Sequence, residues 1–129
     1  MADIIVYLTL SGNSIDTEFV TKALDITPTS IRRNDEILPN GRLFGHTEWS
    51  YDTGLINTID LPVVFNLILP KFFHNTMKMR EIADELKAEW SILVYIKSKD
   101  IQEPIIVIPP FVIQFASEIG AEIGFDLYT

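Results

Sequence analysis

Residues Asp3–Leu10 read DIIVYLTL, and the alternation of their side chains predicts a β-strand with two different sides. Successive side chains of a strand point to opposite faces of its sheet. One side here is aliphatic and the other mixes an aromatic ring with smaller groups: Ile4, Val6, Leu8 and Leu10 against Ile5, Tyr7 and Thr9. The sequence therefore predicts a sheet with one side buried and a second side of mixed chemistry.

Capping residues and prolines mark the expected helices. We expect helices to begin at Asp16, at Asp60 and at Asn75 or Thr76, where a polar side chain precedes an apolar run. A further helix is expected over Phe111–Ile119, with Gly120 as its terminator.

The remaining strands follow from turn signals and from short β-branched runs. The turn sequence Pro39-Asn40-Gly41 predicts a hairpin between Glu36–Leu38 and Arg42–Phe44, and we expect its second strand to run on to Thr53. Three more strands are expected over Trp90–Lys97, Pro104–Ile108 and Ala121–Leu127.

Strands dispersed among helices predict an α+β fold. We expect a two-layer sandwich in which a mixed, mostly antiparallel sheet of about five to six strands carries helices on one face. The length of 129 residues, without a linker or repeat, indicates a single domain over residues 1–129. The other face of the sheet would then be open to a partner.

The side of the sheet taken by Trp49 and Tyr51 is ambiguous. In the stretch Gly45–Gly54, GHTEWSYDTG, these two rings share one side of the expected strand. Either they are buried beneath the helices, or they join Tyr7, Tyr95 and Tyr128 in an aromatic platform on the open face. Tyrosine and tryptophan are the side chains that dominate protein contact surfaces.

Composition excludes several classes of function. Lys and Arg number 10 against 18 Asp and Glu, and the net charge of −8 disfavours nucleic acid as a partner. With no cysteine, disulfides and thiolate metal sites are ruled out. The opening residues do not resemble a signal peptide and no apolar run reaches a membrane-spanning length, so we expect no membrane and a cytoplasmic protein.

No pattern of catalytic or metal-binding residues is present. His46 and His74 lie in different elements and outside the spacings of known zinc motifs, so we expect no metal, no cofactor and no catalytic residue. Glu48 and Asp52 are too loosely placed to form a working carboxylate pair. The chain reads as a binding protein more than as an enzyme.

Arg32 and Arg33, with Arg42 across the expected hairpin, form the one local basic cluster of the sequence. Such a cluster could hold a carboxylate or phosphate. It could equally be a solvated loop balanced by Asp35 and Glu36. Asp126 is either part of a contact surface or a structural carboxylate that bonds one of these arginines or the backbone.

Several short phrases together resemble an uncharacterised bacterial family, the domain-of-unknown-function family 4279. They are LDITP at Leu24–Pro28, the pair Trp49-x-Tyr51 and the closing Asp126-x-Tyr128. The resemblance spans nearly the whole chain and brings no established activity. It implies a small cytoplasmic protein, in some members in settings that resemble toxin–immunity loci.

We therefore expect a non-enzymatic protein-binding module, an immunity-type protein that neutralises a basic toxin domain being one form of it. The candidate surface comprises Trp49, Tyr51, Asp126, Tyr128, Arg32 and Arg33. Two alternatives stay open. The first is a sensor or enzyme for a small anion, with a cleft lined by Arg32, Trp49 and Asp126, and the second is a homodimer through the open sheet face.

Overall fold

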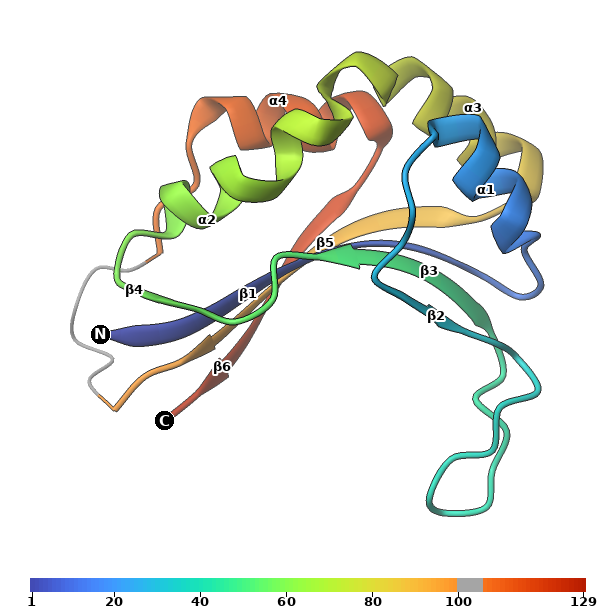
Figure 1. Cartoon of the computed structure of the whole chain (residues 1–129), viewed down its shortest axis with the longest axis horizontal. Coiled ribbons are helices and arrows are strands. Elements are labelled where there is room, and N and C mark those ends of the chain that lie inside the picture. The colour runs from blue at the N-terminus through green and yellow to red at the C-terminus, as the bar shows by residue number, and fades with distance from the viewer. Residues whose placement is uncertain (100–105) are drawn as a thin grey trace.

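The computed structural model describes residues 1–99 and 106–129, and it is a sheet with helices on one side (Figure 1). The elements in chain order are β1 Ala2–Gly12, α1 Thr17–Leu24, β2 Ser30–Arg32, β3 Thr47–Asp52, β4 Ile56–Thr58, α2 Leu61–Ile68, the 3-10 helix η1 Leu69–Asn75, α3 Thr76–Leu86, β5 Glu89–Lys97, α4 Pro110–Ile119 and β6 Glu122–Tyr128. This confirms the predicted α+β class with a mixed sheet and one helical layer.

The sheet has the order β2-β3-β1-β5-β6, and β4 also pairs with β1. All pairs in it are antiparallel except the parallel pair β5–β6. The parallel pair arises because α4 carries the chain from one end of β5 back over the sheet to the start of β6. The sheet is therefore mixed and mostly antiparallel, as predicted.

The aliphatic side of β1 forms the floor of the core. Ile4, Val6, Leu8 and Leu10 are fully buried beneath the helices, and burying each such side chain contributes about 1.5–3 kcal/mol. Facing side chains from β5 continue this floor, and the helices cover it with apolar residues: Ile92, Val94 and Ile96 below, and Val64, Phe65, Ile68, Phe72, Met79, Val112 and Phe115 above.

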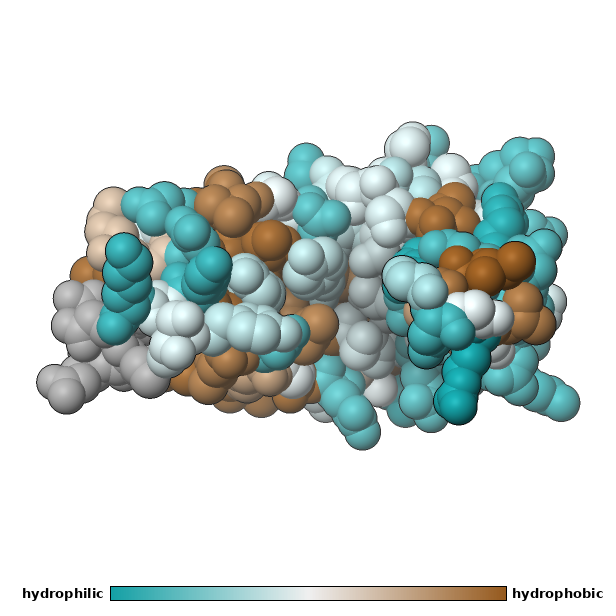
Figure 2. Space-filling model, turned by 90° about the horizontal axis from the view of Figure 1, so that it is seen from below, coloured by the Kyte–Doolittle hydropathy of each residue, from teal (hydrophilic) through white to brown (hydrophobic). Residues whose placement is uncertain are grey.

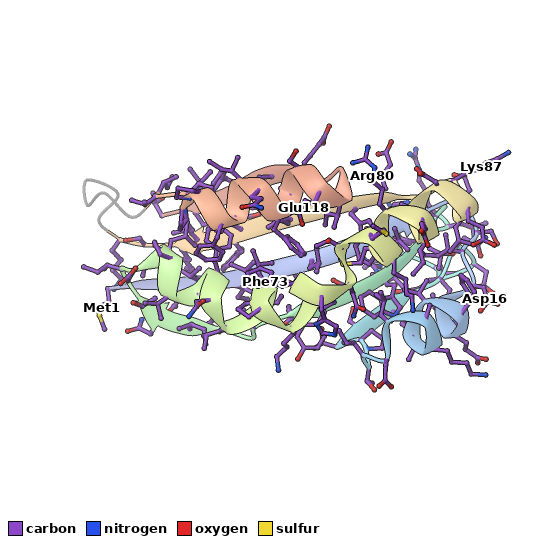
Figure 3. All side chains as sticks on the ribbon, turned by 90° about the horizontal axis from the view of Figure 1, so that it is seen from above. Met1, Asp16, Phe73, Arg80, Lys87 and Glu118 are labelled. Carbon is purple, nitrogen blue, oxygen red and sulfur yellow. The ribbon has the colours of Figure 1, made fainter. Side chains whose placement is uncertain are left out.

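The helices begin near the predicted residues, but of the expected N-terminal caps only Asp16 forms a side-chain cap bond, whereas Asp60 and Asn75 form none. Asp16 accepts a hydrogen bond from the backbone N–H of Phe19 and begins α1. Asp60 occupies the position before α2 without a side-chain cap bond. Gly120 ends α4 with a positive φ of 71°, which an L-residue with a Cβ adopts with strain. Arg80 of α3 donates to the carbonyl oxygens of Ser117 and Glu118 (Figure 3) and so caps the end of α4.

Two strand predictions are wrong in part. The hairpin forms its turn, with Leu38 donating to the Arg42 carbonyl, yet its only bridge joins Ile37 to Leu43 among the described residues. Its second arm does not continue into β3, because Gly45, with a φ of 88°, turns the chain first. The expected strand Pro104–Ile108 falls partly outside the described residues, and the described part, residues 106–108, is not a strand.

Trp49 lies in the core, which corrects its placement on the candidate surface. Its side chain is fully buried, its indole N–H donates to the Thr21 hydroxyl of α1 at 3.0 Å, and its ring meets Trp90 edge-on at 5.9 Å between centroids. Tyr51 shares this side of the sheet, half-buried against Phe72 of η1 at 5.6 Å. Both rings thus serve to join the sheet to the helices.

We predict that Trp49→Ala lowers the free energy of unfolding by about 3–5 kcal/mol, because it removes a buried aromatic ring and its hydrogen bond. Urea denaturation measures the loss. Phe19→Ala is the matched control, since Phe19 is 39% exposed on α1, and it should cost less than about 1 kcal/mol. Equal losses in the two variants would contradict the core position of Trp49.

Candidate functional site

The side of the sheet away from the helices, here called the open face, is seen in Figure 2, where hydrophilic and hydrophobic patches lie side by side. Register and alternation place these residues on it: Asp3, Ile5, Tyr7, Thr9 and Ser11 of β1; Ser30 and Arg32 of β2; Glu48, Ser50 and Asp52 of β3; Ser91, Leu93, Tyr95 and Lys97 of β5; Glu122, Gly124, Asp126 and Tyr128 of β6. No helix formed by residues 1–99 or 106–129 covers this face (Figure 1).

Side chains of the open face are ordered in rows across the strands. A row of small hydroxyl groups crosses the middle of the sheet, and within it the Thr9 and Ser50 hydroxyls are 2.8 Å apart. Beside it lies a row in which Asp52 faces Tyr7 and Tyr7 faces Leu93. The next row places Tyr95 between Ile5 and Asp126.

The second and third rows, with Tyr128 from the row that follows, bring phenol rings and carboxylates together in what we call the tyrosine–aspartate cluster: Tyr7, Asp52, Tyr95, Asp126 and Tyr128. The rings of Tyr95 and Tyr128 are 5.3 Å apart, and the Tyr128 hydroxyl donates to Asp126 Oδ2 at 3.2 Å. Tyr128 is 48% exposed, so a partner can reach the cluster from solvent. It presents large rings and negative charge at the same place.

The cluster raises the pKa values of two of its tyrosines. Burial, followed by the charges of Asp52, Tyr95 and Asp126, raises the pKa of Tyr7 above its ordinary value. The hydrogen bond to Asp126, followed by the charge of that carboxylate, raises the pKa of Tyr128. Both phenols therefore stay neutral to a higher pH than an ordinary tyrosine. The single O–H of Tyr128 is already donated to Asp126, and its hydroxyl oxygen can still accept a hydrogen bond.

The two arginines of the candidate surface, Arg32 and Arg33, lie at different places. Arg32 is on the open face, where its guanidinium bonds Glu36 Oε1 at 3.0 Å and stacks on the Phe44 ring at 4.0 Å. It fastens the hairpin, which projects below the sheet (Figure 1). Arg33 instead lines a groove at α1. Neither arginine bonds Asp126, because β2 and β6 are opposite edges of the sheet, so Asp126 does not pin the hairpin.

The groove at α1, here called the basic groove, has a volume of about 500 Å³. It is lined by Thr17, Glu18, Thr21, Lys22, Thr27, Pro28, Thr29, Ser30, Ile31 and Arg33. Sequence reasoning missed this site. Lys22 and Arg33 are far apart in the chain, and no pattern in the sequence links them.

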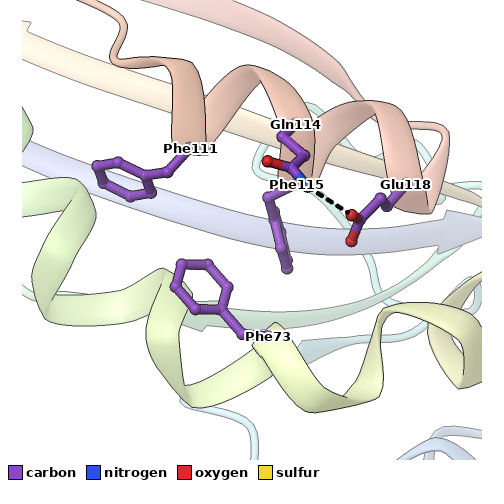
Figure 4. A pocket seen from close by; sticks show the side chains of 5 residues that line it. All are labelled: Phe73, Phe111, Gln114, Phe115 and Glu118. Atoms are coloured by element: carbon purple, nitrogen blue, oxygen red, sulfur yellow. Dashed lines mark hydrogen bonds between the residues drawn. The ribbon is translucent and has the colours of Figure 1, made fainter.

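A second hollow, on the helical side, has a volume of about 250 Å³ and lies between η1 and α4 (Figure 4). Its walls are three phenylalanines, Phe73, Phe111 and Phe115, with Gln114 and Glu118 at one end. The Gln114 side chain donates to Glu118 Oε1 at 3.2 Å. An apolar wall with a single carboxylate offers no pair of groups for acid–base chemistry.

Metal chemistry has no support among residues 1–99 and 106–129, where no group of three His, Asp or Glu side chains is placed to hold an ion. His46 is 3.3 Å from Glu48 Oε2 at the mouth of the hairpin, and its ring lies 4.1 Å from that of Phe44. His74 belongs to η1 on the helical side. The two histidines therefore do not converge on one site.

These features define a small α+β domain with an open, acidic and tyrosine-bearing sheet face. The sequence profile of the family described as "Domain of unknown function (DUF4279)" matches residues 2–129, and the chain belongs to this family. The resemblance expected from LDITP, Trp49-x-Tyr51 and Asp126-x-Tyr128 is thereby confirmed. Searches of curated proteins and of solved structures find no match.

None of the helices over the described residues combines the length and apolar character that a membrane crossing requires.

The raised pKa of Tyr7 predicts a loss of stability at alkaline pH. Because the folded-state pKa exceeds the unfolded value of about 10, the stabilisation by neutral Tyr7 is complete below about pH 10. It is lost as pH rises through the folded-state pKa. Tyr7→Phe should therefore weaken the decline of the unfolding free energy above about pH 10, as measured by urea denaturation along a pH series.

Variants of the two carboxylates distinguish what raises the pKa of Tyr7 from what raises the pKa of Tyr128. Asp126→Asn should lower the pKa of Tyr128, whose hydrogen bond to Asp126 is the largest contribution, whereas Asp52→Asn should lower mainly that of Tyr7. NMR titration of the tyrosine rings follows each phenol. Asp84→Asn, an exposed change on α3, is the control and should move neither pKa. A Tyr7 that titrates at or below 10 would contradict the cluster.

Proposed function

We propose that this protein is a non-enzymatic protein-binding module that recognises a basic partner through its open face. The single observation that carries the proposal is the tyrosine–aspartate cluster, uncovered on a sheet whose helices pack on the other side. Tyrosine rings supply contact area with little loss of rotamer freedom, and neutral phenols add hydrogen bonds.

The sign of the charge supports a basic partner. Asp52 and Asp126 flank the rings, and the whole chain has a net charge of −8. Such a field attracts a positively charged protein and speeds the encounter. We propose a toxin domain as that partner, neutralised in the cytoplasm by this chain acting as an immunity-type protein.

The same charges argue against a homodimer that joins two open faces. Two copies of one acidic face would bring like charges together, which is destabilising. A partner of opposite charge removes this repulsion. We therefore favour a different protein over a second copy as the occupant of this face.

The proposed contact set differs from the sequence-based one. Tyr128 and Asp126 stay in it, Tyr7 and Tyr95 join them, and Arg32 lies at its margin on β2. Trp49 and Tyr51 leave it because they face the helices.

We predict that Tyr128→Ala and Tyr95→Ala weaken binding about tenfold or more, because tyrosines at the centre of an interface carry most of its energy. The native-host partner captured by the wild-type chain is identified by mass spectrometry, purified and titrated calorimetrically. Phe19→Ala, an exposed ring in the helical layer, is the control and should bind as wild type. If both tyrosine variants fold and bind the partner as tightly as the wild-type chain, the proposal is wrong.

The basic groove supports a second candidate, a site for a small anion such as a carboxylate or phosphate. Lys22 and Arg33 both line it, and within the described residues neither side chain forms an ion pair. Glu18 also lines the groove, so its cationic side chains outnumber its carboxylates by two to one, in a chain whose net charge is −8. Cationic side chains with nearby hydroxyls are suited to hold an anion.

The anion cleft expected from the sequence combined Arg32 with Trp49 and Asp126, and the structure does not bring these three together. Trp49 is on the helical side of the sheet, and the other two lie near opposite edges of the open face. Only Arg33 of the expected residues carries over to the groove.

We predict that inorganic phosphate shifts the amide NMR signals of Lys22 and Arg33, and that Lys22→Gln with Arg33→Gln weakens this binding about tenfold. Arg42→Gln is the matched control, since Arg42 is an exposed arginine of the hairpin. The anion site is excluded if phosphate shifts these amide signals equally in all variants, or if it shifts none of them even at high concentration.

A further inference from the structure

The two edges of the sheet differ in how well they are protected. At one edge, β2 spans only three residues and runs directly into Arg33 and the hairpin. At the other edge, β6 spans seven residues, and its sequence EIGFDLY holds neither proline nor lysine. Short strands, prolines and charged side chains, lysine above all, are devices that keep edges from pairing with another chain. The β6 edge is long and has neither proline nor lysine, and its two charged residues, Glu122 and Asp126, lie on the open face.

The hydrogen bonds of β6 show which of its backbone groups are free. Tyr128 accepts a bond from the Ser98 N–H through its carbonyl, so its peptide groups point toward β5. Peptide groups alternate in direction along a strand. Ile123, Phe125 and Leu127 therefore direct their N–H and C=O groups outward, and no strand among the described residues pairs with them.

The same three residues expose apolar side chains along this edge. They lie on the helical side of the sheet, because they face Ile92, Val94 and Ile96 of β5. Ile123 and Phe125 are only half-buried, and Leu127 is 51% exposed. Unpaired backbone groups and uncovered apolar side chains thus coincide at one edge, and a neighbouring strand would satisfy both.

A second copy of β6 fits this edge in one antiparallel register. Outward-pointing residues must face one another, and among pairings that join five or more residues of β6 this leaves a two-fold axis at Gly124, at Phe125 or at Asp126. The axis at Gly124 sets Glu122 against Asp126, and the axis at Asp126 sets that carboxylate against itself. Like charges directly opposite are destabilising. Only the axis at Phe125 avoids both.

In the register centred on Phe125, each pair is complementary. Phe125 faces its own copy and Ile123 faces Leu127 on the helical side, whereas Glu122 faces Tyr128 and Gly124 faces Asp126 on the open face. About six backbone hydrogen bonds form across such a junction.

We propose that two copies of this chain associate through antiparallel pairing of their β6 edges about a two-fold axis at Phe125. The two sheets become one, and both open faces lie on its same side because the axis is perpendicular to the sheet. The dimer presents two tyrosine–aspartate clusters side by side. It does not depend on what the open face binds.

Single cysteines test the register directly, since the natural chain has none. In the proposed dimer the two Cα atoms at position 125 are about 5.5 Å apart, within the range that a disulfide spans. Those at position 127 are roughly 13 Å apart. Phe125→Cys should therefore form disulfide-linked dimers under mild oxidation at least about tenfold faster than Leu127→Cys. Equal rates in the two folded variants would overturn the register.

Leu127→Lys tests the association without a crosslink. A lysine on an edge strand opposes pairing, so sedimentation over a concentration series should show a dimer dissociation constant raised about tenfold or more. Leu43→Lys is the matched control: Leu43 is 62% exposed on the hairpin and makes the same chemical change away from β6. It should dimerise as wild type, as should Tyr7→Ala on the open face. A wild-type chain that stays monomeric at every concentration would refute the proposal.

Discussion

The pairing of β1 with strands on both of its sides is the constraint on which the rest of the structure depends. β3 and β5 are registered against it residue by residue, so the alternation of β1 decides the side that each of their side chains takes. A slip by one residue would turn Ile4 and Val6 outward and Tyr7 into the core. The burial of the aliphatic set therefore determines where the phenol rings and carboxylates of the open face lie.

Local pattern predicts the parts of this fold in which the two sides of a strand differ strongly. It predicts β1, β5, β6 and the caps at Asp16 and Gly120. In β3 neither side is aliphatic, since a Thr, Trp and Tyr side is set against a Glu, Ser and Asp side. Alternation shows that Trp49 and Tyr51 lie on the same side of the sheet, but it does not show whether that side faces the helices. Their side is decided by pairing with Leu10 and Leu8 of β1, a tertiary contact that a single sequence does not display.

The short strands, the basic groove and the hollow between η1 and α4 are not predictable from the sequence, because they too arise from tertiary contacts. Ser30–Arg32 has little intrinsic β preference and becomes a strand by pairing with β3, where Thr29 bonds both the Ser50 carbonyl and Asp52. The hairpin was predicted from its turn, but the left-handed conformation of Gly45 separates it from the sheet. Asp126 and Tyr128 of the candidate surface lie on the open face, a side predictable from the apolar residues Ile123, Phe125 and Leu127 that alternate with them.

Unequal edges limit how this sheet can grow. Pairing at β6 about a two-fold axis uses the same edge in both copies, so no further β6 edge remains once two chains have met. The edges of the dimer would then be the two β2 strands, each three residues long. In each copy Arg32 of β2 contacts Glu36 and the Phe44 ring of the hairpin that projects beside this edge. Such an edge offers too few backbone groups to template another strand. An open apolar edge on one side and a blunt, charged edge on the other thus favour a closed pair over a fibre, and the acidic open face stays free for a different partner.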